Sequence, residues 1–245
     1  DVVDDAPVGS DVAQTLTAST TTLTYNLTII FDVSGSMGNT VAGRTRMDLA
    51  QDAVATMLRE YEKLGDVNVM IVAFDDKTRA SGWFDGDVAS AIDYVNSLVP
   101  GSGTWYDDAL NRVISEYAAT PPPTADKSLI YFLSDGSPTS GHSLDSTVAY
   151  GGQTGVAAWE QFVTDNADIS FAIGVGSGVS LTSLQPVAFP NTNSDQYAQV
   201  VTNEAQLANT LLSTVQAGVA QGSTALIASG TGEGLVLGEI GRAHV

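Results

Sequence analysis

The sequence is poor in positive charge and contains no cysteine. Of its 245 residues, 9 are Lys or Arg and 28 are Asp or Glu, which gives a net charge of -19 at pH 7. Without a basic cluster to neutralise phosphates, nucleic acid and anionic membrane surfaces are unfavourable partners. Without cysteine there is no disulfide or thiolate chemistry, which fits a secreted bacterial protein better than a disulfide-bonded animal ectodomain.

The sequence also lacks long apolar runs and the common catalytic motifs. No run reaches the length of a membrane span, so we expect no membrane insertion. The motifs Gly-x-Ser-x-Gly and His-Glu-x-x-His and a Walker A phosphate loop are absent. His142 lies in a loop rich in Ser and Gly, where we expect a solvated polar residue rather than a base. We therefore expect no enzymatic activity.

Composition divides the chain into four segments. Residues 1–22 are polar and rich in Thr, as in a linker or the tail of an earlier β module. Residues 23–219 carry periodic apolar patterns and are predicted to form one domain. Residues 220–238 are a Gly-rich connector, and residues 239–245 read like a translated sequencing-adapter oligonucleotide, so we exclude them as an artefact.

Buried strands alternate with amphipathic helices along residues 23–219. Apolar runs predict strands over residues 25–33, 67–74, 127–133 and 169–175, with weaker strands over 80–84 and 196–201. Apolar positions three and four apart predict helices over residues 44–63, 87–98, 107–118, 159–166 and 204–219. Such alternation is typical of parallel βαβ units. We therefore predict an α/β fold with a doubly wound, mainly parallel, Rossmann-like sheet, helices on both faces, and a site at the carboxyl ends of the strands.

The most informative motif is Asp32-Val33-Ser34-Gly35-Ser36, which directly follows the apolar run that ends at Phe31. It places one carboxylate and two hydroxyls at alternate positions on the turn that leaves a buried strand. Hard cations such as Mg²⁺ prefer oxygen ligands and keep exchangeable positions. Because hydroxyls are neutral, an ion held mainly by them retains charge for an external ligand. The motif therefore indicates binding through a metal before it indicates catalysis.

Two further loops are predicted to lie at the same edge of the sheet. Gly101-Ser102-Gly103-Thr104 precedes a helix, and Ser134-Asp135-Gly136 follows a buried strand. Taken singly, a hydroxyl before a helix is usually an N-cap, and Asp-Gly is usually a turn. Their order and placement together favour a shared site, because ligands of open α/β sheets bind at the carboxyl ends of the strands.

The three motifs together resemble the von Willebrand factor type A domain and its metal-ion-dependent adhesion site, over roughly residues 23–219. The resemblance implies that Ser34, Ser36 and Thr104 are hydroxyl ligands, while Asp32 and Asp135 act mostly through water. It implies Mg²⁺ as the ion, with Ca²⁺ or Mn²⁺ as alternatives. An acidic group of a protein or of an acidic glycan would fill the open coordination position.

Three neighbouring residues have alternative interpretations. Asp107 and Asp108 lie in the first turn of a predicted helix, where the helix dipole favours acids, and we leave both outside the ligand set. Trp105 stands where the family more often has a small polar residue. It would either add a contact surface beside the metal or pack under the loop, and the sequence does not decide between the two.

A narrower resemblance is carried by the segments 82–84, 103–110 and 131–139, which are similar to A domains near the C-terminal end of large bacterial repeats-in-toxin (RTX) adhesins exported by type I secretion. The segment 2–7 is similar to the junction after their β-sandwich repeats. The resemblance implies a divalent-cation-dependent adhesion or protein-interaction module of a secreted or cell-surface bacterial adhesin. The alternative is a regulatory subunit of an intracellular chelatase or ATPase-coupled assembly, in which A domains also occur.

Overall fold

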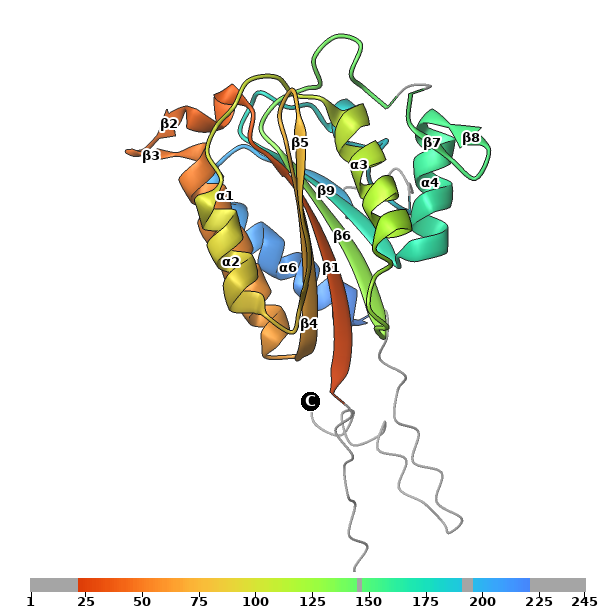
Figure 1. The fold of residues 1–245 in the computed structure, drawn as a ribbon. Helices are drawn as coiled ribbons and strands as arrows, with labels where there is room; N and C mark the ends of the chain where they lie inside the picture. The colour runs from red at the N-terminus through yellow and green to blue at the C-terminus, as the bar shows by residue number, and fades with distance from the viewer. Residues whose placement is uncertain (1–21, 145–146, 191–195, 221–245) are drawn as a thin grey trace, which may run out of the picture.

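A six-stranded sheet runs through the centre of the molecule in the computed structural model, which describes residues 22–144, 147–190 and 196–220 (Figure 1). The strand order is β10-β9-β6-β1-β4-β5. The strands are β1 (Leu23–Asp32), β4 (Gly65–Phe74), β5 (Thr78–Asp85), β6 (Lys127–Ser134), β9 (Ile169–Val175) and β10 (Ala198–Val201). All neighbours pair in parallel except β4 and β5. The predicted mainly parallel α/β sheet is confirmed.

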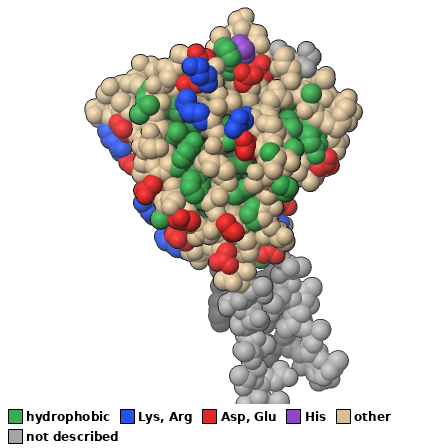
Figure 2. Space-filling model, in the orientation of Figure 1, with side chains coloured by type: hydrophobic (Ala, Val, Ile, Leu, Met, Phe, Trp, Pro, Cys, Tyr) green, Lys and Arg blue, Asp and Glu red, His purple; other side chains and the backbone are tan. Residues whose placement is uncertain are grey.

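Helices cover both faces of this sheet, as predicted (Figure 1). One face carries α1 (Arg46–Glu62), α2 (Val88–Ser97) and α6 (Leu207–Ala220), and the other carries α3 (Tyr106–Ala119) and α4 (Gly155–Asn166). A single turn, α5 (Leu181–Leu184), precedes β10. Among the described helices, none combines the length and the apolar character needed to cross a membrane. Acidic side chains are scattered over the face shown in Figure 2.

Short elements account for most differences from the sequence prediction. The helix predicted from residue 44 begins at Arg46, because β2 (Thr40–Val41) and β3 (Arg44–Thr45) pair as a hairpin before it. The predicted loop over residues 136–155 contains a second hairpin, β7 (Ala149–Tyr150) and β8 (Gln153–Thr154). Two 3-10 turns, η1 (Gly35–Gly38) and η2 (Glu204–Gln206), complete the elements. Residues 1–21 and 221–245, which hold nearly all of the predicted linker, connector and artefact, lie outside the described residues.

The central position of β1 explains its continuous apolar run. Every β1 residue from Tyr25 to Asp32 is buried, since strands flank β1 on both sides and helices cover both faces. The edge strand β5 is only half buried along most of its length. After β1 the chain passes to α1 on one face, and after β6 it passes to α4 on the other face. The carboxyl ends of β1 and β6 therefore form the point where ligands of doubly wound sheets bind.

Candidate metal centre

The first two motif loops are tied together through their backbones. The Gly101 amide donates to the Val33 carbonyl oxygen at 2.5 Å, and the Gly35 amide donates to the Ser102 carbonyl oxygen at 3.0 Å. The Val33 amide in turn donates to the Phe74 carbonyl oxygen of β4 at 2.8 Å. These bonds place the loop that precedes α3 directly against the turn that leaves β1.

Gly101 permits this close approach. A β-carbon at Gly101 would lie 1.8 Å from Oδ2 of Asp75, which is far inside any allowed contact. Asp75 is itself buried, and its Oδ1 accepts the Lys77 amide at 2.8 Å. The loop can therefore reach β1 only with glycine at this position or with a displacement of Asp75.

Asp32 is fully buried at the end of β1 and is held by neutral donors. The Ser34 amide donates to its Oδ1 at 2.6 Å, and the Ser134 hydroxyl donates to its Oδ2. The predicted first and third loops are thus joined through the Asp32 carboxylate. Ser134 lies inside the third motif, but nothing in its spacing predicted a role for its side chain.

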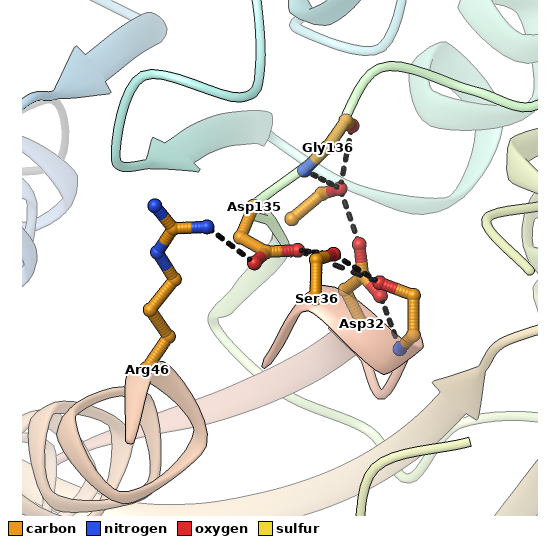
Figure 3. A network of polar contacts seen from close by, with 7 residues as sticks. Asp32, Ser36, Arg46, Asp135 and Gly136 are labelled. Carbon is orange, nitrogen blue, oxygen red and sulfur yellow. Dashed lines mark hydrogen bonds and ion pairs between the residues drawn. The ribbon is translucent and has the colours of Figure 1, made fainter. Parts of the chain in front are cut away.

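Asp135 brings the two serine hydroxyls of the first loop to the third loop (Figure 3). Its Oδ1 accepts the Ser36 hydroxyl at 2.6 Å and lies 3.4 Å from the Ser34 hydroxyl oxygen. The two serine oxygens are 3.1 Å apart. Its Oδ2 pairs with a terminal nitrogen of Arg46 at 3.0 Å. Sequence reasoning missed Arg46, because nothing in the spacing links residue 46 to residue 135.

Thr104 borders the same small space. A β-carbon at Gly136 would lie 3.7 Å from the Thr104 hydroxyl oxygen and 3.9 Å from that of Ser36. The Thr104 amide donates to the Thr139 hydroxyl oxygen at 3.2 Å, and the Thr104 carbonyl oxygen accepts the Thr139 amide at 2.9 Å. The structure therefore brings all five predicted site residues to one edge of the sheet.

The electrostatics of the site favour a cation. Burial, with a smaller contribution from the charge of Asp135, raises the pKa of Asp32 to about 7 against the opposing effect of the hydrogen bonds from Ser134 and Ser34. Two carboxylates at this depth repel one another, and each interacts favourably with a positive charge placed between them.

The oxygen separations fit a small divalent ion. In octahedral Mg²⁺ coordination with bonds of about 2.1 Å, adjacent ligand oxygens are about 3 Å apart. The oxygens of Ser34, Ser36 and Asp135 are separated by 2.6 to 3.4 Å. No group of three or more His, Cys, Asp or Glu side chains suited to a metal occurs in the described part of the chain, so an ion here would depend on the hydroxyls.

Trp105 and His142 stack face to face beside this site. Their ring centroids are 3.9 Å apart with an interplanar angle of 4°. His142 Nδ1 lies 3.1 Å from Oδ1 of Asp107, whose Oδ2 accepts the Thr147 hydroxyl at 3.0 Å. His142 is partly exposed, at 28%, and its contacts with Trp105 and Asp107 were not predicted, because the loop folds back over the start of α3. Asp107 is itself buried within this network.

Comparison with known proteins shows what this region is similar to. Residues 27–137 match the family model of the von Willebrand factor type A domain. A search of curated protein sequences gave no match.

Solved structures share the fold at low sequence identity. The vWF domain of the type V pili tip protein Mfa5 from Porphyromonas gingivalis is 16% identical with a TM-score of 0.61, over 84% of this chain and 99% of that domain. The pilus adhesin SpaC from Lactobacillus rhamnosus GG is 16% identical with a TM-score of 0.60, over 82% of this chain and 31% of SpaC.

The proximal thread matrix protein 1 of the mussel byssus is 15% identical with a TM-score of 0.62, over 79% of this chain. This chain spans about half of the mussel protein, 47% of its length. That structure of the mussel protein has a zinc-occupied MIDAS motif, the metal-ion-dependent adhesion site.

Proposed function

Because residues 27–137 match the family model of the von Willebrand factor type A domain, we propose that the chain is a divalent-cation-dependent adhesion or protein-interaction module. Ser34, Ser36 and Thr104 would hold the ion through their hydroxyls, and Asp32 and Asp135 would balance its charge. Mg²⁺ suits this set of hard oxygen donors, with Ca²⁺ or Mn²⁺ as alternatives. When bound, the ion would supply an electrophilic position for an external acidic group.

The proposal rests on three oxygens that come from two distant loops. The hydroxyl oxygens of Ser34 and Ser36 and one carboxylate oxygen of Asp135, which is about 100 positions later in the sequence, lie within 3.4 Å of one another. Two hydroxyls that donate to a buried carboxylate can also form a hydrogen-bond network that needs no metal. Here a second buried carboxylate, Asp32, adds negative charge that the hydroxyls do not neutralise.

The proposed partner is a protein or an acidic glycan that contributes a carboxylate. An anionic partner does not bind readily to a chain of net charge -19 unless a cation mediates the contact. The metal dependence of binding is therefore part of the proposal. No side chain at the site has the nucleophile and base arrangement of a hydrolase, and we propose binding without catalysis.

The setting that we propose is the surface of a bacterium. Two of the structurally similar proteins are bacterial pilus components, one a tip protein and one an adhesin. The resemblance to RTX adhesins suggests type I secretion as the export route. Neighbouring genes offer a check, since a type I exporter next to the coding sequence supports this setting and an adjacent ATPase supports the intracellular alternative.

Calorimetric titration of the full chain with Mg²⁺, Mn²⁺ and Ca²⁺ tests the metal site. We expect one ion to bind per chain, and we expect Ser34→Ala to weaken binding at least tenfold by removing a direct ligand. Ser115→Ala is the matched control, because Ser115 is exposed on α3 and its hydroxyl donates only to the Arg112 carbonyl oxygen. No binding by the unaltered protein, or equal affinities for both variants, would end the proposal.

A further inference from the structure

The two buried carboxylates of the site are stabilised in different ways. Asp32 receives hydrogen bonds from the Ser34 amide and the Ser134 hydroxyl, both of which are neutral donors. Asp135 is paired with the guanidinium of Arg46 at 3.0 Å. Among the described residues, no other Lys or Arg forms an ion pair with either carboxylate.

We propose that Arg46 is the internal counter-ion of this site. Its guanidinium balances the charge of Asp135 when no metal is bound, and it holds Oδ2 of Asp135 so that Oδ1 faces the serine hydroxyls. The inference rests on the proposed metal site for its effect on the ion, whereas its effect on the metal-free fold stands alone. Arg46 is thus a positioning residue, and it does not serve as a ligand.

The fold fixes the position from which Arg46 reaches Asp135 (Figure 3). Arg46 is the first residue of α1, and its amide donates to the Asn39 carbonyl oxygen at 3.0 Å. The preceding Thr45 forms a capping box with Asp48, which fixes the helix start. The Arg46 side chain is 15% exposed and that of Asp135 is 0% exposed, so solvent screens the pair little.

Burial decides the sign of the expected effect. Removing one partner of a buried ion pair leaves an uncompensated charge, which is strongly destabilising. A divalent cation among the hydroxyls would provide an alternative counter-charge for Asp135. Loss of Arg46 should therefore destabilise the metal-free protein far more than the metal-loaded protein. It should also make the thermal stability of the domain depend on the ion.

Thermal unfolding of the full chain carrying Arg46→Gln tests this, once with a chelator and once with saturating Mg²⁺ or Mn²⁺. We expect the midpoint to fall by about 10 °C without metal and by less than half as much with metal. Arg44→Gln is the matched control, because Arg44 lies two residues away and pairs with the exposed Asp52. Its midpoint should change by at most about 2 °C in either condition.

A double-mutant cycle in the metal-free protein separates the counter-ion from the metal site. If Arg46 acts on Asp135, Arg46→Gln should lower the free energy of unfolding less than half as much in an Asp135→Asn background, where residue 135 carries no charge. This result is independent of whether the unaltered protein binds metal. Additive effects of the two substitutions, or equal losses with and without metal in a protein that binds metal, would overturn the inference.

If Arg46→Gln does not fold, Arg46→Lys provides a second variant at the same position. A lysine keeps the charge but loses the planar fork of the guanidinium. We expect its metal-free midpoint to lie closer to that of the unaltered protein than to that of the glutamine variant. Complete unfolding of Arg46→Gln together with a normal midpoint for Arg46→Lys also supports the counter-ion. Failure of both variants to fold, with or without metal, would contradict it.

Discussion

The two ends of the central strands bury polar groups of opposite character. Near the amino ends, Asn26 and Asn68 are 2% and 4% exposed and close a network among themselves. Asn26 donates to the Pro123 carbonyl oxygen at 2.6 Å, and Asn68 donates to Asn26 at 2.9 Å. At the carboxyl ends, Asp32 and Asp135 are equally buried but can only accept hydrogen bonds when ionised.

Of these two polar networks, only the one at the carboxyl ends is suited to a cation. An amide both donates and accepts, so a pair of amides satisfies itself and the neighbouring backbone without any charge. Two buried carboxylates need hydrogen-bond donors and positive charge from other residues. Ser134 and Ser34 supply donors to Asp32, and Arg46 supplies one positive charge to Asp135. Equal burial therefore gives a structural network at one end and the proposed binding site at the other.

The largest expected effect comes from placing a carboxylate in the amide network. Asn26→Asp would set a buried anion against the Pro123 carbonyl oxygen, which is an acceptor. We expect the free energy of unfolding at pH 7 to fall by about 3–5 kcal/mol, as for other uncompensated buried charges. Urea denaturation measures this change. Asn203→Asp, the same substitution at an exposed position, should change stability by about 0.5 kcal/mol or less.

The reciprocal substitution removes a charge at the other end. Asp32→Asn should weaken Mg²⁺ binding about 10- to 100-fold, because it halves the buried negative charge around the proposed ion. The metal-free protein should become no less stable, since the repulsion between Asp32 and Asp135 is lost. Calorimetry and urea denaturation without metal measure the two effects. An unchanged affinity would show that Asp32 does not act on the ion.

A smaller effect is expected from forcing the site loops apart. Gly101→Ala would place a methyl group 1.8 Å from Oδ2 of Asp75, and we expect a loss of about 2 kcal/mol together with weaker metal binding. At Gly38 a methyl group would meet only the Pro100 side chain at 3.6 Å, so Gly38→Ala is the control. Similar losses for both variants in urea denaturation would argue against the close approach at Gly101.

The smallest predicted effect concerns the stacked pair beside the site. His142→Ala removes the ring that faces Trp105 and the contact with Asp107, and we expect a loss of about 1 kcal/mol. Metal affinity should change less than in Asp32→Asn, because neither ring belongs to the proposed ligand set. Urea denaturation followed by Trp fluorescence measures the loss of stability, and calorimetry measures the metal affinity. A loss of metal binding as large as that of Asp32→Asn would place the stack in the site itself.

Periodicity was sufficient to predict the fold, because the buried strands and the amphipathic helices carry strong local patterns. The two hairpins and the 3-10 turn after β1 were missed, since elements of two to four residues have too little pattern and are held by contacts with the rest of the chain. The antiparallel direction of β5 was also not predicted, although the three residues between Phe74 and Thr78 are too few for the crossover that a parallel pair needs.

The site was predictable where residues lie in motifs, and it was not where a lone side chain reaches across the fold. Ser34, Ser36 and Asp135 meet as the strand order requires. Arg46 reaches Asp135 only because a hairpin sets the start of α1, which no spacing in the sequence reveals. The stacking of His142 on Trp105 was missed for the same reason, since the two residues are 37 positions apart in the sequence.

The placement of β1 bears on how the domain would carry mechanical load. Leu23 begins β1 and Ala220 ends α6 at the end of the sheet opposite to the three site loops (Figure 1). Flanking segments thus attach at one pole, and a bound partner would pull at the other. Such a pull runs along β1, whose ladders to β4 and β6 extend over most of its length. Tension would shear many backbone hydrogen bonds at once instead of opening them one by one.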